Sequence, residues 1–222
     1  MAKAGVDAIE VWIEPNLDRE WPEGQISGGA YANMLRVSYQ AIKAANPNTL
    51  VISAAPAPTG AEASFPDQVR NDDAWLRELV RGGGLQYMDC VGDYYEGILP
   101  PDATNGDPRG ESYMRYFTSM LNTYSDTVVA QKPLCFTELG YLSAEGIGTL
   151  PPPFAWASKV TVWQQAAWLA QAAMIASQSS KVRLMIVWNV NFTTYGSDPQ
   201  SGYAIVRPDR SCPACDTLAD MP

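Results

Sequence analysis

Short apolar runs rich in β-branched and aromatic residues alternate along the chain with longer amphipathic stretches, and polar loops with Gly and Pro separate them. The apolar runs predict five strands, at residues 8–12, 50–54, 88–92, 134–137 and 182–189. The amphipathic stretches predict helices at residues 30–45, 72–81, 111–124 and 159–177, and a short final segment is expected at residues 203–206. Such alternation, repeating roughly every 40 to 45 residues, is typical of a parallel α/β sheet or barrel.

Three of these segments carry further expectations. Residues 159–177 are apolar around much of the helix circumference, so this helix is predicted to pack on two sides, with Trp163 and Trp168 as packing residues. The run 182–189 reads as a parallel strand buried on both faces. The loop 94–110 is long and rich in Pro, Gly and Asp, which favours a functional role.

Composition excludes several classes of function. A net charge of -9 repels phosphate backbones and argues against nucleic acid as a partner. No apolar stretch reaches the roughly 18 residues of a membrane span, and no basic start leads into an apolar signal segment. The sequence predicts one soluble domain over residues 1–222, with no membrane partner. Because the chain contains no histidine, catalysis by an imidazole base is excluded, and acid or base chemistry falls to other side chains such as carboxylates.

The four cysteines are too few for a disulfide-stapled scaffold in a chain of this length. Cys90 and Cys135 lie within apolar runs and are expected to be buried small hydrophobic residues. Cys212 and Cys215, separated by Pro and Ala, favour a local disulfide or free thiols over a metal site. A thiol-based redox function remains a weaker alternative, because no helix is expected to begin at this pair.

Two glutamates stand where predicted parallel strands end. Glu14 follows the first strand and Glu138 follows the fourth, and in parallel α/β folds ligands gather at these strand ends. Cleavage of a glycosidic bond needs two carboxyl groups, one acid for the leaving oxygen and one carboxylate to attack carbon or activate water. The pair is therefore predicted to be catalytic.

Aromatic and amide side chains surround the two glutamates along the chain. Aromatic rings stack on sugar rings, while amides hold hydroxyl groups. The predicted substrate-binding residues are Trp12, Asn16, Trp21, Tyr94, Tyr95, Trp188, Asn189 and Asn191, with Tyr195 as a weaker candidate. Asp93 and Glu96 add negative charge nearby, but the acidic segments lack the spacing of a calcium loop, so neither a metal nor a cofactor is expected.

Two of these segments resemble motifs of the clan A glycoside hydrolases. Residues 8–16, Ala-Ile-Glu-Val-Trp-Ile-Glu-Pro-Asn, are similar to the fourth-strand motif of that clan, and residues 132–141, Lys-Pro-Leu-Cys-Phe-Thr-Glu-Leu-Gly-Tyr, are similar to the seventh-strand motif. The resemblance implies a TIM (β/α)8-barrel, a retaining mechanism, Glu14 as acid/base and Glu138 as nucleophile. It also implies that Trp188 is the eighth-strand tryptophan that floors the subsite of cleavage, and that Tyr94 or Tyr95 hydrogen-bonds Glu138.

The chain departs from the clan pattern in two respects. Ile13 stands where such enzymes carry an asparagine that binds the sugar 2-hydroxyl. Only about five βα units, from the fourth strand onward, are expected, so the fold is a partial barrel with open edges. Self-association or a complementing barrel fragment is expected to cover these edges. A non-catalytic carbohydrate-binding or structural remnant of such a barrel therefore stays the main alternative, and the resemblance implies an extracellular or periplasmic location.

Overall fold

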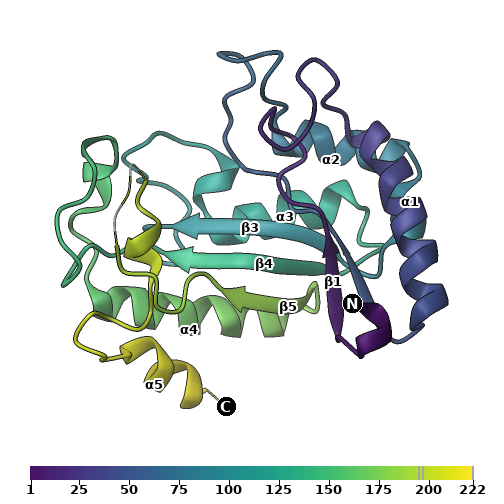
Figure 1. The fold of residues 1–222 in the computed structure, drawn as a ribbon. Helices are drawn as coiled ribbons and strands as arrows, with labels where there is room; N and C mark the ends of the chain where they lie inside the picture. Colours follow the sequence, from purple (N-terminus) through teal and green to yellow (C-terminus); the bar gives the residue numbers. More distant parts are fainter. Residues whose placement is uncertain (195, 197, 222) are drawn as a thin grey trace. The chain divides into compact units, whose positions relative to one another are not determined.

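The computed structural model describes residues 1–194, 196 and 198–221, in which strands and helices alternate along the chain (Figure 1). The strands are β1 (Ala8–Val11), β2 (Leu50–Ser53), β3 (Val91–Gly97), β4 (Leu134–Tyr141) and β5 (Val182–Val187). The α-helices are α1 (Gly28–Ala45), α2 (Asp72–Arg81), α3 (Phe117–Thr127), α4 (Val162–Ser179) and α5 (Pro213–Ala219). Short 3-10 helices are η1 (Ala2–Ala4), η2 (Gly84–Tyr87), η3 (Tyr113–Arg115), η4 (Pro152–Ala157) and η5 (Gln200–Tyr203). None of the helices in the described part of the chain has the length and apolar character of a membrane span.

Backbone pairing joins neighbouring strands in the order of the sequence. β1 and β2 pair in parallel, beginning with Ala8 opposite Leu50. A parallel bridge links Ile52 of β2 to Cys90, which directly precedes β3. β3, β4 and β5 form a three-stranded sheet in that order, and their arrows point the same way in Figure 1. The predicted α/β fold, with parallel strands alternating with helices in an open sheet, is confirmed.

The described chain divides into two compact units. The first comprises Met1–Tyr94, Leu121–Thr137 and Lys181–Leu184, and the second comprises Tyr95–Met120, Glu138–Ser180 and Met185–Pro222. β3, β4 and β5 each begin in the first unit and end in the second. The two predicted catalytic glutamates consequently belong to different units.

In the first unit, α1 packs against α2 with unusually close backbone contact. Ser27 caps the start of α1, because its hydroxyl accepts the amide N–H of Gly29 at 3.1 Å. A Cβ atom on Gly28 would lie 2.1 Å from the Trp75 carbonyl oxygen, so only glycine fits there. The hydroxyl of Tyr31, a fully buried residue of α1, donates to the Val11 carbonyl at 2.7 Å, which fixes the end of β1 against the helix.

The cysteine expectations change in the structure. Cys90 and Cys135 are fully buried and form a disulfide in the core cluster of the first unit, so the prediction of two unpaired buried cysteines is wrong. The apolar pattern identified their burial but carries no information on which strands are neighbours.

The second cysteine pair forms the local disulfide that was one of the two expected states. Cys212 is the N-cap residue of α5, and its sulfur accepts the amide N–H of Cys215 at 3.2 Å. The expectation that no helix begins at this pair is therefore wrong. α5 packs against α4, with the Thr217 hydroxyl donating to the Ala166 carbonyl at 3.1 Å.

In the second unit, α4 is held on two sides, as predicted. On one side Gln165, which is fully buried, donates its amide to the Tyr141 carbonyl of β4 at 2.7 Å, and the other side receives α5. Trp168 packs edge-on to Tyr141 with ring centroids 5.6 Å apart, as expected. Trp163 is 65% exposed, so its predicted packing role is wrong.

Several predicted boundaries move for a common reason. β3 continues to Gly97 and β4 to Tyr141, because residues whose side chains look polar or amphipathic in the sequence are buried there by neighbouring elements. The third predicted helix starts later, at Phe117, after a separate 3-10 turn. β5 alternates between half-buried and exposed residues, with Ile186 46% exposed, so its predicted burial on both faces is wrong. The expected segment 203–206 contains no strand.

Candidate active site

The chain leaves β1 through two residues in an unusual backbone conformation. Trp12 and Glu14 have φ angles of 78° and 42°, in the left-handed region that non-glycine residues rarely enter. The amide N–H of Glu14 donates to the Ala55 carbonyl at 3.2 Å, which ties this turn to the segment after β2. Strained positions of this kind concentrate at functional sites, and here the strain sets the direction of a carboxylate at a strand end.

The Glu14 carboxylate forms an ion pair with Arg19 of the same loop. The Glu14 side chain is 17% exposed, whereas the Arg19 side chain is 63% exposed. An ion pair with one partner this exposed contributes little net free energy, about 0 to 1 kcal/mol. Glu14 is therefore a half-buried carboxylate with a partner that a bound molecule can displace.

The remaining predicted residues of this loop differ in their exposure. Trp12 is 51% exposed, and its indole N–H donates to the Glu20 carbonyl at 2.9 Å. Trp21 is half-buried and packs edge-on to Tyr31, with centroids 6.2 Å apart. Asn16 is fully buried; its amide nitrogen donates to the carbonyls of Ala57 and Arg70, each at 2.9 Å. Asn16 thus connects two loops, and none of its surface is open to a sugar.

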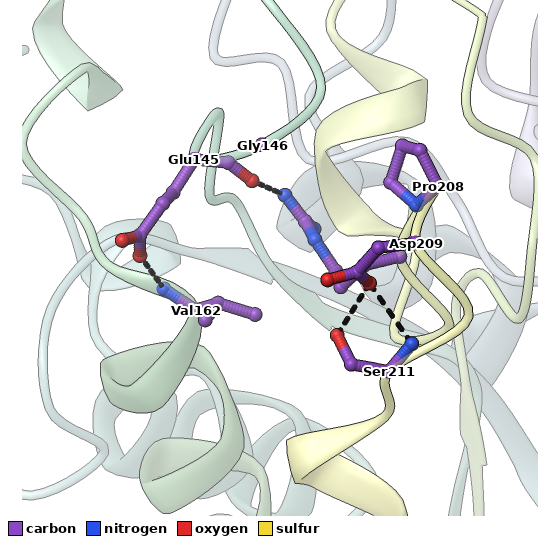
Figure 2. Close-up of a pocket in the computed structure, with 7 residues that line it drawn as sticks. Glu145, Gly146, Val162, Pro208, Asp209 and Ser211 are labelled. Carbon is purple, nitrogen blue, oxygen red and sulfur yellow. Dashed lines mark hydrogen bonds between the residues drawn. The ribbon is translucent and has the colours of Figure 1, made fainter.

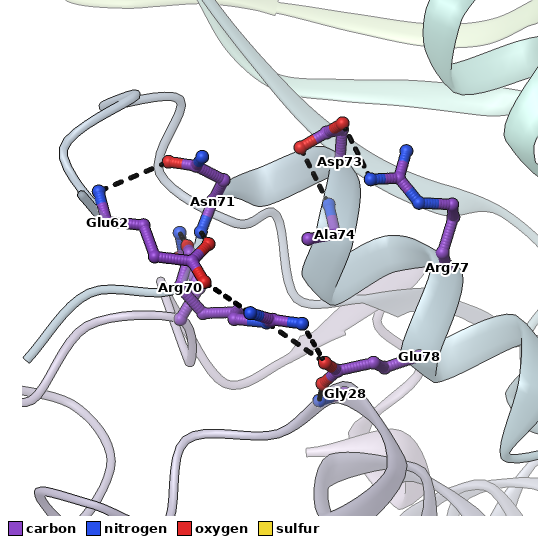
Figure 3. A network of polar contacts seen from close by, with 9 residues as sticks. Gly28, Glu62, Arg70, Asn71, Asp73, Ala74, Arg77 and Glu78 are labelled. Carbon is purple, nitrogen blue, oxygen red and sulfur yellow. Dashed lines mark hydrogen bonds and ion pairs between the residues drawn. The ribbon is translucent and has the colours of Figure 1, made fainter. Parts of the chain in front are cut away.

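A polar network in the loop after β2 supports that connection (Figure 3). Arg70 forms ion pairs with Glu62 and Glu78, and the Glu78 carboxylate also accepts the Gly28 amide N–H at 3.1 Å. Leu17 and Val69 form an antiparallel bridge between the loops that follow β1 and β2. The loop that carries Glu14 is therefore bonded to the loop after β2, which is itself held by a network of ion pairs.

Two carboxyl groups in the first unit, one half-buried and one fully buried, were not singled out as site residues. Glu10, inside β1, accepts the Ala55 amide N–H at 3.0 Å and the Thr137 hydroxyl at 3.1 Å, and burial raises its pKa. Asp93 of β3 is fully buried, and a hydrogen bond from the Tyr94 backbone favours its ionised form only in part. Burial and the nearby Asp72 raise the pKa of Asp93 well above its usual value. A charged residue inside an apolar strand was the sequence signal for Glu10.

In the second unit, Glu138 occupies a distinctive position in β4. All eight residues of β4 are described, and Glu138 alone among them is half-buried while the other seven are buried. The backbone N–H of Trp188, directly after β5, donates to the carbonyl of Leu139 at 2.9 Å. The predicted nucleophile and the predicted subsite tryptophan thus lie on neighbouring strand ends, with Leu139 as the residue that joins them.

Three of the other predicted substrate-binding residues are less exposed than the sequence implied. Tyr95 is 1% exposed, and its hydroxyl donates to the Arg115 carbonyl at 3.1 Å. Tyr94, in the first unit, is 5% exposed. Asn189 is 6% exposed, and its amide donates to the Gln200 carbonyl at 2.7 Å. Asn191 is exposed, and Tyr195 lies outside the described residues.

Sequence reasoning missed a polar chain that meets Trp188. The Trp188 indole N–H donates to the side-chain oxygen of Gln200 at 2.5 Å, and Gln200 in turn hydrogen-bonds Glu96 of β3. Tyr203, 2% exposed, also hydrogen-bonds Glu96. Burial raises the pKa of Glu96, and these two donors lower it in part. Gln200 and Tyr203 carry no periodic signal in the sequence, because they lie about a hundred residues from Glu96 along the chain.

Two hollows of the second unit are lined by residues other than the predicted site residues. One, of about 370 Å³, is lined by Glu145, Gly146, Val162, Arg207, Pro208, Asp209 and Ser211 (Figure 2). In it the Glu145 carboxylate accepts the Val162 amide N–H at 2.7 Å, at the start of α4, and the Asp209 carboxylate accepts two hydrogen bonds from Ser211. The other, of about 330 Å³, is largely apolar, and Trp156 and Trp168 are among its lining residues. Across the described residues, no group of three or more His, Cys, Asp or Glu side chains is arranged to hold a metal ion.

No protein-family model matches the chain, and no curated protein matches it. Solved structures do match in fold. A family 39 glycoside hydrolase from Bacteroides cellulosilyticus has a TM-score of 0.59 at 18% identity, over 99% of this chain and 42% of the other. A family 128 exo-β-1,3-glucanase from Aureobasidium namibiae has a TM-score of 0.60 at 14% identity, over 98% of this chain and 69% of the other.

A family 51 α-L-arabinofuranosidase from Bifidobacterium longum gives a TM-score of 0.54 at 12% identity, over 95% of this chain. The chain spans 42% of the length of this enzyme and of the family 39 hydrolase. The likeness establishes the fold: an open α/β sheet structurally similar to part of the TIM barrel of clan A glycoside hydrolases.

Proposed function

We propose that this protein is a retaining glycoside hydrolase that cleaves O-glycosidic bonds by double displacement, with Glu14 and Glu138 as its carboxyl pair. One observation carries the proposal. Glu14 follows a parallel strand, Glu138 lies within one, and each is half-buried, where a carboxyl group can meet a substrate without being fully solvated. The likeness in fold to three glycoside hydrolases supports the same assignment.

In the first step Glu138 attacks the anomeric carbon and forms a glycosyl ester, while Glu14 gives a proton to the departing oxygen. In the second step Glu14, now a carboxylate, takes a proton from the water that attacks the same carbon, and Glu138 is released. Two inversions leave the configuration of the sugar unchanged. The mechanism requires the two carboxyl groups to lie about 5 Å apart in the working enzyme.

Arg19 fits the two protonation states that Glu14 needs. Its ion pair favours the carboxylate form, which is the form that acts as a base in the second step. Because the Arg19 side chain is 63% exposed and weakly held, a sugar entering the site can displace it before the acid step.

The proposed sugar contacts fall into two classes. Trp12, Trp21 and Trp188 offer indole surface for stacking, and Trp12 is more exposed than Trp21 in the loop around Glu14. Asn191 offers an exposed amide. Tyr94, Tyr95, Asn16 and Asn189 are buried, so in this proposal they shape the site from behind.

The test is hydrolysis of 4-nitrophenyl glycosides by the native chain, Glu14→Gln and Glu138→Gln. Glu23→Gln, at an exposed glutamate beyond Glu14 in the same loop, is the matched control. We expect turnover by the native and control proteins only. A 2-deoxy-2-fluoro glycosyl fluoride should label the native protein, and peptide mass mapping should locate the sugar on Glu138. A label elsewhere, or full activity without either glutamate, contradicts the mechanism.

A non-catalytic carbohydrate-binding protein is the second candidate, and Ile13 favours it. Ile13 is 43% exposed beside Glu14, and its side chain offers a sugar hydroxyl no hydrogen bond. This candidate predicts sugar binding by calorimetry without turnover. Turnover that depends on both glutamates excludes it.

We further propose that the sheet edges are covered by self-association or by a complementing barrel fragment. Among the described strands, β1 and β5 each have one neighbour, and β5 exposes Ile186. Exposed strand edges recruit further strands because their N–H and C=O groups are unpaired. Light scattering on the sample used for kinetics tests this: a monodisperse, active monomer contradicts self-association.

A further inference from the structure

The ends of β3 and β5 and the start of η5 meet in a polar chain that the two-glutamate mechanism does not use. Glu96 lies near the end of β3, Trp188 directly follows β5, and Gln200 begins η5. All three residues belong to the second unit. Their contacts fix the direction of each hydrogen bond.

The middle member of the chain, Gln200, has both a donor and an acceptor in its side chain. The Trp188 indole nitrogen only donates, so the Gln200 oxygen, 2.5 Å away, must face it. The Gln200 amide nitrogen therefore faces Glu96, and an ionised carboxylate only accepts. Glu96 thus selects one of the two possible amide orientations, and that orientation gives Trp188 its acceptor.

Two further contacts hold the chain in place. The buried Tyr203 hydroxyl gives Glu96 a second donor. The Asn189 side-chain amide donates to the backbone carbonyl of Gln200 at 2.7 Å, and the Asn189 backbone N–H donates to the backbone carbonyl of Tyr203 at 3.3 Å. Asn189, the residue after Trp188, consequently ties the segment after β5 to η5.

We propose that Glu96 and Gln200 are positioning residues that fix the Trp188 indole for stacking on the sugar ring bound beside Glu138. The proposal rests on the proposed function for its ligand, a pyranose or furanose ring with an apolar face. Trp188 is half-buried, and its backbone is bonded to Leu139, the residue after Glu138. An indole that is free to rotate would lose this alignment, because stacking requires its face, not its edge, toward the sugar.

The direction of the chain is fixed most firmly when Glu96 is ionised, because an ionised carboxylate only accepts hydrogen bonds. Burial opposes ionisation, the two hydrogen bonds favour it, Arg109 is the positive group that favours it, and Asp198 is the negative group that opposes it. Arg109 is itself oriented by Asp107, through contacts of 2.9 and 2.7 Å. The chain is therefore sensitive to a second negative charge placed at Gln200.

Gln200→Met and Gln200→Glu test the proposal. Methionine fills the space without an acceptor, and we expect KM for a 4-nitrophenyl glycoside to rise about tenfold, with a smaller change in kcat. Glutamate restores an acceptor but faces Glu96, so its KM should approach the native value at pH 5, where the pair shares a proton, and rise about tenfold by pH 8. Gln178→Glu, on the exposed surface of α4, adds the same charge and should follow the native pH profile.

A readout without sugar separates this inference from the proposed function. The tryptophan fluorescence spectrum of the native protein minus that of Trp188→Phe reports the environment of Trp188. The same subtraction made in the Gln200→Met background should give a shifted difference spectrum, while far-UV circular dichroism stays unchanged. If the native protein binds no sugar, the proposed function fails, and this spectrum still decides whether Gln200 positions Trp188. An unshifted spectrum, or an unchanged KM in Gln200→Met and a flat pH profile in Gln200→Glu, overturns the inference.

Discussion

The two strand ends that carry the predicted catalytic glutamates are built in opposite ways. Glu14 lies outside β1, in a turn with two left-handed residues, and its ion-pair partner is exposed. Glu138 lies inside β4, where every other residue is buried. A group that must change its protonation state twice benefits from an adjustable partner, whereas a nucleophile must be aimed at one carbon atom. The difference in scaffold thus matches the difference in the chemistry proposed for each residue.

The sharpest way to break this comparison is to remove each carboxylate in turn. Glu138→Ala should lower kcat by about 10⁴-fold or more for every substrate, since in the proposed mechanism Glu138 forms the covalent ester. Glu14→Ala should lower kcat/KM by about 10² to 10⁴-fold for substrates with poor leaving groups. The loss should be much smaller for 2,4-dinitrophenyl glycosides, because their leaving group departs without a proton. Initial rates across a leaving-group series measure both effects.

Azide provides the control for these roles. In Glu14→Ala it attacks the glycosyl ester and should give an azide of retained configuration, whereas in Glu138→Ala it attacks the substrate and should give the inverted azide. Proton NMR of the products distinguishes the two. The opposite pairing of products would exchange the roles assigned to the glutamates.

Glycines in the two regions allow the rigidity of the scaffolds to be compared. A Cβ at Gly140, two residues beyond Glu138, would lie 2.4 Å from the Trp188 carbonyl oxygen, whereas one at Gly24, in the loop after Glu14, has no atom within 4 Å. We expect Gly140→Ala to cost about 2 to 3 kcal/mol of unfolding free energy and to lower activity. Gly24→Ala should cost about 1 kcal/mol, through its φ of 70° alone, with activity kept. Urea denaturation and kinetics on both variants measure this, and equal losses would remove the distinction.

Features of the fold could be predicted from the sequence where they depend on residues that are close together along the chain. The helix Asp72–Arg81 and the glycines that end it were predicted correctly, because spacing and caps lie within a few residues. The start of α1 was missed by two residues, since Gly28 sits in the helix owing to close packing on Trp75. The burial of Tyr95 was missed because the elements that cover it, Phe117 among them, follow later in the chain.

The candidate site shows the same division. Glu14, Glu138 and Trp188 were found because each follows or interrupts an apolar run. Gln200 and Tyr203 were not, because nothing around them marks a partner in β3. The disulfide between Cys90 and Cys135 was not predicted, for a related reason. The burial of each cysteine was predictable, whereas their pairing depended on strand order.

β3 extends the comparison to buried carboxyl groups that have no catalytic role in the proposal. Glu96 has two side-chain hydrogen-bond donors, whereas Asp93 has only a hydrogen bond from the Tyr94 backbone, and burial and the nearby Asp72 raise the pKa of Asp93 well above its usual value. A raised folded-state pKa means that the unfolded chain releases this proton first, so stability is full below about pH 4 and falls as the pH rises toward the folded pKa. Relative to Asp93→Asn, the native protein should lose up to about 1.4 kcal/mol per pH unit in that window.

Urea midpoints for the native protein and Asp93→Asn, measured between pH 4 and 8, test the sign. Glu111→Asn at an exposed site would be a poor control because Glu111 bonds Tyr116, so Asp18→Asn, in an exposed loop, is preferred. The native and Asp18→Asn curves should run parallel, while Asp93→Asn becomes relatively more stable with pH. A native protein that gains stability over Asp93→Asn as the pH rises would show that Asp93 is ionised in the fold.

The smallest effect tests the adjustable side of the comparison. Arg19→Met removes the partner of Glu14 but keeps most of its apolar stem, so unfolding free energy should change by less than about 1 kcal/mol. If a bound sugar displaces Arg19 from Glu14, binding to Arg19→Met no longer has to break this ion pair. KM should therefore stay equal or fall slightly. A loss of kcat comparable to that of Glu14→Ala would instead mean that Arg19 aims the carboxylate during proton transfer. In that case the loop would hold Glu14 as firmly as β4 holds Glu138, and the contrast between the two strand ends would not extend to their function.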